Sequence, residues 1–154
     1  MLCDHQKVNF MDEYISKDDG YFKWHVEPEK FIKKSLFGNQ VHILNVTSQK
    51  WMDESRYSGP DGAVWKHQVA IVIPSTLSDT KHAGVWIDSP CSTEKPSKFE
   101  ENILVTDQVA HNTQAIAVTI RNIPVCPIVF TDDPDQIERV EESFMAIAWG
   151  NFLN

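Results

Sequence analysis

The stretch Val64–Pro74 constrains the fold more than any other part of this sequence. Its middle, Gln68–Ile73, is a short, mostly apolar run rich in β-branched residues, and Pro74 ends it. β-branched residues favour strands, and a short apolar run of this kind is typical of a strand buried on both faces. We therefore predict that this segment is a central strand of a sheet.

The rest of the chain predicts further strands and two helices. Strands are expected at 41–47, 83–88 and 115–120, and helices at 98–112 and 135–153. Asp133 and Pro134 are expected to begin the second helix, as its cap and its first residue. A helix between two buried strands implies a parallel crossover with the helix on a sheet face. The predicted fold class is α/β, with a mixed, mostly parallel sheet and helices on its faces.

The first forty residues differ from the rest. They are polar, with aromatic residues scattered among charges, and they show no long helical or alternating period. We interpret residues 1–40 as a lead-in arm that is anchored by its rings, with one short strand around Phe22–Val26. Residues 41–154 then form the sheet-and-helix domain.

Composition excludes several classes of function. The net charge of −8 on 154 residues, without a basic stripe, disfavours nucleic acid as a partner. No window approaches the length of a membrane span, and residues 1–7 lack the apolar core of a signal peptide, so the localisation stays unknown. The three cysteines are widely spaced and include no C-x-x-C, which predicts free thiols and no zinc site.

Several short motifs, in order along the chain, resemble one family. They are Asp12–Tyr14, Asn45–Trp51, Val64–His67, Pro124–Phe130, Asp132–Asp133 and Glu141–Trp149, followed by Phe152. Together they are similar to the PhoPQ-activated pathogenicity-related proteins, whose eukaryotic members are autocrine proliferation repressor-like.

This resemblance implies a partial α/β-hydrolase-like fold. The four predicted strands would be the first four of that fold, and a fifth would pair beside Ala83–Asp88, not beside Ala115–Ile120. A protein partner or a missing C-terminal half is therefore expected at the Ala83–Asp88 edge. The family's serine-bearing elbow would lie beyond residue 154, and no G-x-S-x-G occurs in the chain. We expect no catalytic residue, cofactor or metal ligand here.

The resemblance leaves three functions open. The first is a non-catalytic N-terminal segment that acts by recognition, as a secreted growth-restraining signal does in eukaryotic relatives. The alternative is part of a serine hydrolase or peptidase of the α/β-hydrolase type, with its catalytic residues beyond residue 154. The third is a truncated cytoplasmic paralogue with a binding role.

Two places in the chain are candidate sites. Asp88 and Ser89 follow a predicted parallel strand, and open α/β sheets bind ligands at that end of their strands. Asn45 begins the sequon Asn45–Thr47, which is usable only in the secretory pathway and falls inside a predicted strand.

Other residues with catalytic potential have structural interpretations. His67 would need a nucleophile within hydrogen-bond reach to be catalytic, and the sequence assigns none. Asp132 and Asp133 are interpreted as helix-capping residues. Four tryptophans on separate elements are expected to pack in the core: Trp51, Trp65, Trp86 and Trp149.

Overall fold

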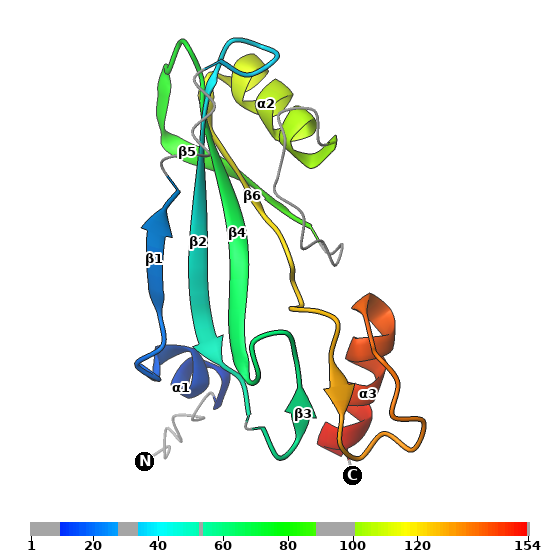
Figure 1. The fold of residues 1–154 in the computed structure, drawn as a ribbon. Coiled ribbons are helices and arrows are strands. Elements are labelled where there is room, and N and C mark those ends of the chain that lie inside the picture. The colour runs from blue at the N-terminus through cyan, green and yellow to red at the C-terminus, as the bar shows by residue number, and fades with distance from the viewer. Residues whose placement is uncertain (1–9, 28–33, 53, 89–100, 154) are drawn as a thin grey trace, which may run out of the picture.

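The computed structural model describes residues 10–27, 34–52, 54–88 and 101–153, and its main feature is a long five-stranded sheet (Figure 1). The strand order is β1-β2-β4-β6-β5. These strands are β1 (Lys23–Val26), β2 (Gln40–Lys50), β4 (Val64–Ile73), β6 (Ala115–Ile120) and β5 (Asp79–Ile87). The organising segment of the sequence, β4, is thus the middle strand, as predicted.

Only one pair in this sheet is parallel. β5 and β6 run parallel because α2 (Glu101–Thr113) lies between them in the chain. The pairs β1–β2, β2–β4 and β4–β6 are antiparallel. The class is mixed α/β, as expected, but the prediction of a mostly parallel sheet is wrong. Only the β5–α2–β6 unit has the crossover that parallel pairing requires.

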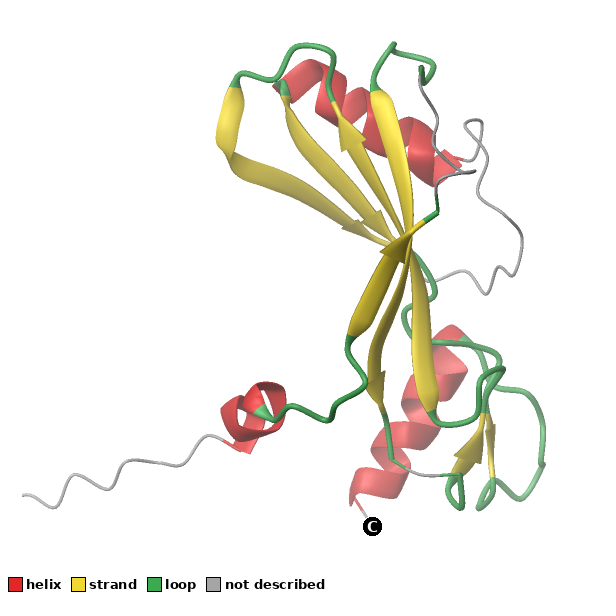
Figure 2. Ribbon diagram, turned by 60° about the vertical axis from the view of Figure 1, so that its left-hand side comes forward, coloured by secondary structure: helices red, strands yellow, loops and turns green. Residues whose placement is uncertain are grey.

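Among the described helices, α2 alone covers the five-stranded sheet, and it covers one face (Figure 2). Ala70 and Val72 of β4 are buried on the side of α2, whereas Val69, Ile71 and Ile73 are half-buried on the other side. The expectation that β4 is buried on both faces, and that both helices cover the sheet, is therefore wrong. Seven residues form what we call the α2 core: Val41, Ile43, Ala70, Val72, Ile103, Ala110 and Ala117.

The second hydrophobic cluster lies at the other end of β2 and β4. It involves a two-stranded sheet of β3 (Tyr57–Ser58) and β7 (Val129–Phe130), together with α3 (Glu141–Leu153). We call it the aromatic core. Its buried members are Tyr57, Ala63, Ile128, Phe130 and Phe144, and Trp51, Trp65, Ile147 and Ala148 pack against them.

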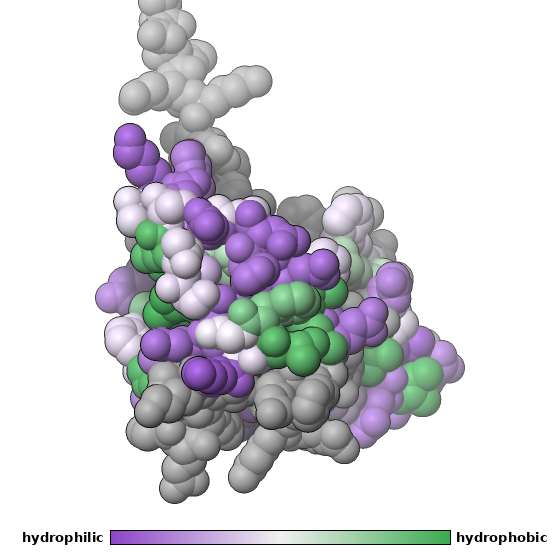
Figure 3. Space-filling view, turned by 90° about the horizontal axis from the view of Figure 1, so that it is seen from above, coloured by the Kyte–Doolittle hydropathy of each residue, from purple (hydrophilic) through white to green (hydrophobic). Residues whose placement is uncertain are grey.

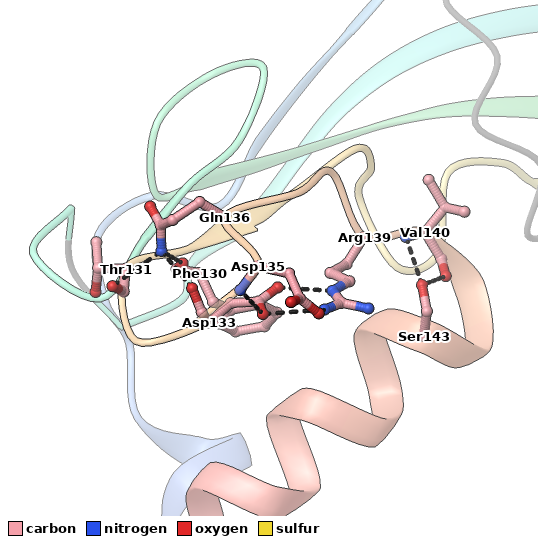
Figure 4. Close-up of polar contacts among 8 residues, drawn as sticks. All are labelled: Phe130, Thr131, Asp133, Asp135, Gln136, Arg139, Val140 and Ser143. Atoms are coloured by element: carbon pink, nitrogen blue, oxygen red, sulfur yellow. Dashed lines mark hydrogen bonds and ion pairs between the residues drawn. The ribbon is translucent and has the colours of Figure 1, made fainter.

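The last helix begins later than predicted. Asp133 caps a turn instead of a helix, because its carboxylate accepts a hydrogen bond from the Asp135 N–H at 3.1 Å. Arg139 also donates to the two carboxylate oxygens, from Nε at 2.7 Å and from Nη2 at 2.9 Å (Figure 4). This ion pair holds the pKa of Asp133 below its usual range. Backbone hydrogen bonds between Ile128 and Arg139 also fix the segment as a non-helical loop. α3 therefore begins only at Glu141, where the Ser143 hydroxyl accepts a hydrogen bond from the Val140 N–H.

A buried polar network fastens α2 to the start of β2. Asp107 of α2 accepts hydrogen bonds from the Ser35 hydroxyl at 2.6 Å, the Phe37 N–H at 3.1 Å and the Asn39 amide at 2.8 Å. Gly38 has φ +83°, a left-handed conformation that glycine adopts without strain, and it forms the turn here. These three donors to the buried carboxylate are thus on one tight turn.

The N-terminal arm is attached through polar contacts. β1 confirms the predicted strand around Phe22–Val26, and a short helix, α1 (Phe10–Ser16), precedes it. The rings of Phe22 and Trp24 are exposed, so the predicted anchoring by rings is wrong for these two. The Tyr14 hydroxyl donates to Gln49 at 3.0 Å, and Asp19 accepts from the Lys50 N–H at 2.8 Å.

Of the four tryptophans predicted to pack in the core, two do so and two are exposed. Trp51 and Trp65 pack in the aromatic core, as predicted. Trp86 on β5 and Trp149 on α3 are exposed, so the core prediction is wrong for them. The view from above shows polar residues interspersed with several groups of apolar residues, one of them near the centre of the view (Figure 3).

Candidate functional site

Asp88 lies at the carboxyl end of the parallel β5–β6 pair, where the sequence placed a candidate ligand site. Its side chain is buried and accepts a hydrogen bond from the Asn102 amide in the first turn of α2. Its backbone N–H donates to the Ile120 carbonyl at 2.8 Å. Ser89 lies outside the described residues. Asp88 thus joins β5 to α2, and a ligand role for Asp88 and Ser89 stays a prediction.

After β6, the backbone continues through two further polar residues, Arg121 and Asn122. The buried Arg121 donates from Nη1 to the Gln68 side-chain oxygen at 3.2 Å, and its N–H donates to the Gln68 carbonyl at 2.9 Å. Asn122 then adopts φ +60°, a left-handed conformation that asparagine tolerates better than most residues. This turn aims the Asn122 carbonyl at β4.

His67 of β4 is hydrogen-bonded to the Asn122 carbonyl. Its Nδ1 lies 2.8 Å from the Asn122 oxygen, and its Nε2 lies 2.8 Å from the Ser48 hydroxyl oxygen. A carbonyl can only accept, so Nδ1 carries the proton and Nε2 accepts from Ser48. The imidazole is only 6% exposed, and burial holds its pKa below the usual range although the Asn122 carbonyl opposes that shift. The ring is therefore neutral at pH 7.

Ser48 reaches His67 because β2 is irregular at this residue. Val46 pairs with His67 across the two strands, and Ser48, two residues further on, lies on the same face. The register shifts between Thr47 and Gln49, leaving Ser48 as the extra residue of a β-bulge. Bulges re-aim side chains, and they are frequent beside active sites.

An open pocket of about 560 Å³ lies beside His67, and Ser48 lines a different pocket of about 520 Å³. His67, Asn122 and Asn45 contribute to the wall of the first pocket. The charged or titratable groups that line it are Lys23, His25, Asp61 and Lys66. Lys66 and Asp61 form an ion pair, so much of the local positive charge is neutralised within the wall.

Asn45 lies in the middle of β2, between β1 and β4. Its amide donates to Glu27 and is half-buried, and its backbone faces His25 and Gln68 in the two neighbouring strands. Glycosylation of Asn45 stays a prediction.

The sequence interpretation of His67 as a hydrogen-bonded structural histidine is consistent with its backbone partner, but it missed Ser48. Nothing in the sequence pattern could have found this serine, because its proximity to His67 comes from the register of two strands and a bulge. Among the described residues, no group of three His, Cys, Asp or Glu side chains could hold a metal ion. In that same part of the chain, no helix is long and apolar enough to cross a membrane.

β5 presents a different kind of surface. Among the described strands, it pairs with β6 alone and forms an edge of the sheet. Val85, Trp86 and Ile87 are 60%, 50% and 63% exposed, although the sequence predicted a buried strand here. Between β5 and α2 lies a small apolar pocket of about 90 Å³, lined in part by Val105 and Val109.

Cys126 corrects the prediction of free thiols, because it is disulfide-bonded. The two remaining cysteines, Cys3 and Cys91, lie outside the described residues.

Comparison with known proteins bears on this chain in three ways. The chain is 29% identical over 145 residues to autocrine proliferation repressor protein A of Dictyostelium discoideum, a match that covers 93% of this chain and 26% of that relative. The chain thus spans about a quarter of the relative's length. No solved structure matches. The profile of the family described as PhoPQ-activated pathogenicity-related protein matches residues 11–154, and the chain belongs to this family.

Proposed function

We propose that this chain is a recognition segment, non-catalytic by itself, that acts as part of a secreted growth-restraining signal. The observation that carries the proposal is the open β5 edge with three exposed apolar residues. Edge strands offer unpaired backbone groups to a further strand, and they are normally blunted by charge, proline or a covering element. Among the described residues, Val85, Trp86 and Ile87 have no such cover.

The kind of contact follows from this geometry. A partner strand added beside β5 would gain backbone hydrogen bonds, and the apolar side chains would supply specificity. The occupant would be a protein partner or the C-terminal remainder of a longer form. The name of the Dictyostelium relative supports a role in restraining proliferation. The disulfide at Cys126 supports an extracellular location, because disulfides persist mainly in oxidising compartments.

A charge placed on the edge tests the proposal. Purified chain is added to cultured cells of the source organism, and the doubling rate is measured together with the protein's oligomeric state. Wild-type protein should slow growth and self-associate, whereas Ile87→Lys should do neither. Trp149→Lys is the matched control, because it also replaces an exposed apolar residue, on α3, away from the edge. Equal effects of the two variants, or a wild-type monomer without effect on growth, would refute edge recognition.

A serine hydrolase of the α/β type is the second candidate, and the strand order favours it. β6 is inserted between β4 and β5, which leaves β5 at the edge where the next strand of a hydrolase-like fold would pair. Expressing the chain with its in-frame downstream sequence tests this candidate. The longer protein should react with a serine-directed fluorophosphonate at a serine beyond residue 154. Absence of such labelling would exclude a serine enzyme.

A further inference from the structure

We propose that Ser48 is an activated nucleophile that accepts an acyl group from a small activated ester, with His67 as its general base. This modification site goes beyond the recognition function and does not depend on it. The site consists of the β2 bulge, the neutral imidazole and the Asn122 carbonyl that orients the ring.

The hydrogen bonds provide the protonation pattern that a base needs. The Asn122 carbonyl, 2.8 Å from Nδ1, holds the proton on that nitrogen, so the Nε2 lone pair faces the Ser48 hydroxyl at 2.8 Å. Nucleophile and base within hydrogen-bond reach, with the base oriented by a third group, are the general signature of an activated serine. Here the third group is a carbonyl dipole instead of a carboxylate.

The surroundings are compatible with a small substrate. Ser48 is half-buried and lines an open pocket of about 520 Å³, which gives an ester access to the serine. His67 lines the separate pocket of about 560 Å³. Burial keeps His67 neutral, which leaves the base ready at pH 7.

The transfer balances without any further reactant. Ser48 Oγ forms a bond to the acyl carbon, and its proton passes to His67 Nε2. The bond between the acyl carbon and the leaving oxygen then breaks, and the proton is delivered from Nε2 to that oxygen. The products are an O-acyl serine and an alcohol, and the imidazole returns to its neutral form.

The test uses p-nitrophenyl acetate on the purified chain. The expected result is a burst of nitrophenol approaching one equivalent per chain, with the acetyl group located on Ser48 by peptide mapping. Ser48→Ala should abolish the burst. His67→Gln should slow it by about 10²-fold or more, the usual contribution of a general base. Ser78→Ala is the matched control and should change nothing, because Ser78 is exposed and donates to Gln114 at 2.7 Å, not to an imidazole.

A pH profile of the wild-type chain keeps the test decisive if His67→Gln fails to fold. The titratable or charged side chains around His67 are Lys23 and His25 of β1, Asp61, Lys66 and Arg121. The rate of Ser48 acetylation should be level at neutral pH and fall only below pH ~6.5, the ordinary value for histidine.

Three results would overturn the proposal: no acetyl group on Ser48, equal labelling rates in wild type and His67→Gln, or a rate proportional to hydroxide concentration throughout. Sustained turnover that requires Ser48 would support the activated serine and contradict the proposed non-catalytic function. Failures of the two proposals are therefore distinguishable.

Discussion

The α2 core and the aromatic core lie at opposite ends of β2 and β4, but they are formed by different types of side chain. The α2 core consists of aliphatic side chains from three strands and one helix. The aromatic core consists largely of rings, supplied by the two-residue strands, the start of β4, a loop and α3. The difference shows that the α2 core follows from the regular strand and helix periods of the sequence, whereas the aromatic core depends on individual contacts between rings.

Trp51 is at the centre of these ring contacts. Its ring centroid lies 5.0 Å from that of Tyr57, 5.4 Å from Trp65, 5.5 Å from Phe144 and 6.3 Å from Phe130. Ring pairs at such separations gain roughly 0.5–1.5 kcal/mol beyond the burial of area. Substitutions in the aromatic core should therefore cost more than equivalent ones in the α2 core.

The largest effect is expected for Phe144→Ala. Phe144 is buried, stacks on Phe130 at 5.6 Å and attaches α3 to the rest of the aromatic core. Losing the ring should lower the free energy of unfolding by about 3–5 kcal/mol, measured in urea. Because Trp51 and Trp65 are close to Phe144, their fluorescence should change at the same time.

Met145→Ala, next to it on α3, is the control, because Met145 is exposed. It should change the free energy of unfolding by no more than about 0.5 kcal/mol. Similar losses for Phe144→Ala and Met145→Ala would mean that α3 is not packed through Phe144.

The next effect is expected for Ile103→Ala in the α2 core. Ile103 is fully buried between α2 and the sheet, and the cavity should cost about 2–5 kcal/mol. The fluorescence of Trp51 and Trp65 should remain native below the unfolding transition, because both rings are in the other core. An altered native spectrum would show that the two cores are one packed unit. Val109→Ala, on an exposed position of α2, is the control.

These two cores also differ in how far the sequence predicted them. β2, β4, β5, β6 and α2 were all expected, because apolar residues recur there with strand or helix periods. β3 and β7 have two residues each, which is too short for any period. The start of α3 was misplaced, because an aspartate before a proline favours a helix start locally and the Asp133–Arg139 ion pair overrides it.

Burial and the candidate site were harder to predict than the elements. Ala83–Ile87 has the composition of a buried strand, and its exposure follows from its position at the sheet edge, which no local pattern records. The same limit applies to Ser48. Its contact with His67 depends on pairing between β2 and β4, so the histidine was recognisable as a candidate and its partner was not.

A smaller effect is expected for Tyr57→Phe. The Tyr57 hydroxyl donates to the Ala63 carbonyl at 2.9 Å and accepts from Trp65 Nε1 at 3.2 Å, and both partners lose it in the variant. The cost should be about 1–3 kcal/mol, because buried groups are left unpaired. The ring remains, so the aromatic packing should be retained in the fluorescence spectrum.

Alkaline pH tests the same hydroxyl in the wild-type chain. Burial raises the pKa of Tyr57 to about 12 from its ordinary value of 10.0. Above pH 10 the unfolded chain loses the proton and the folded chain keeps it, so the free energy of unfolding should fall as pH rises between these two values. Tyr57→Phe should show a shallower slope in that range. Equal slopes would mean that Tyr57 titrates normally.

The smallest effect on stability is expected for Ile87→Thr on β5. Ile87 and Ile103 belong to the same strand–helix–strand unit, yet Ile87 is 63% exposed and Ile103 is fully buried. Threonine keeps the β-branched shape that strands favour, so the free energy of unfolding should change by no more than about 0.5 kcal/mol. Self-association, followed by light scattering, should nevertheless decrease, since the edge loses apolar surface. A loss comparable to that of Ile103→Ala would place Ile87 in the α2 core, and the open edge would not exist.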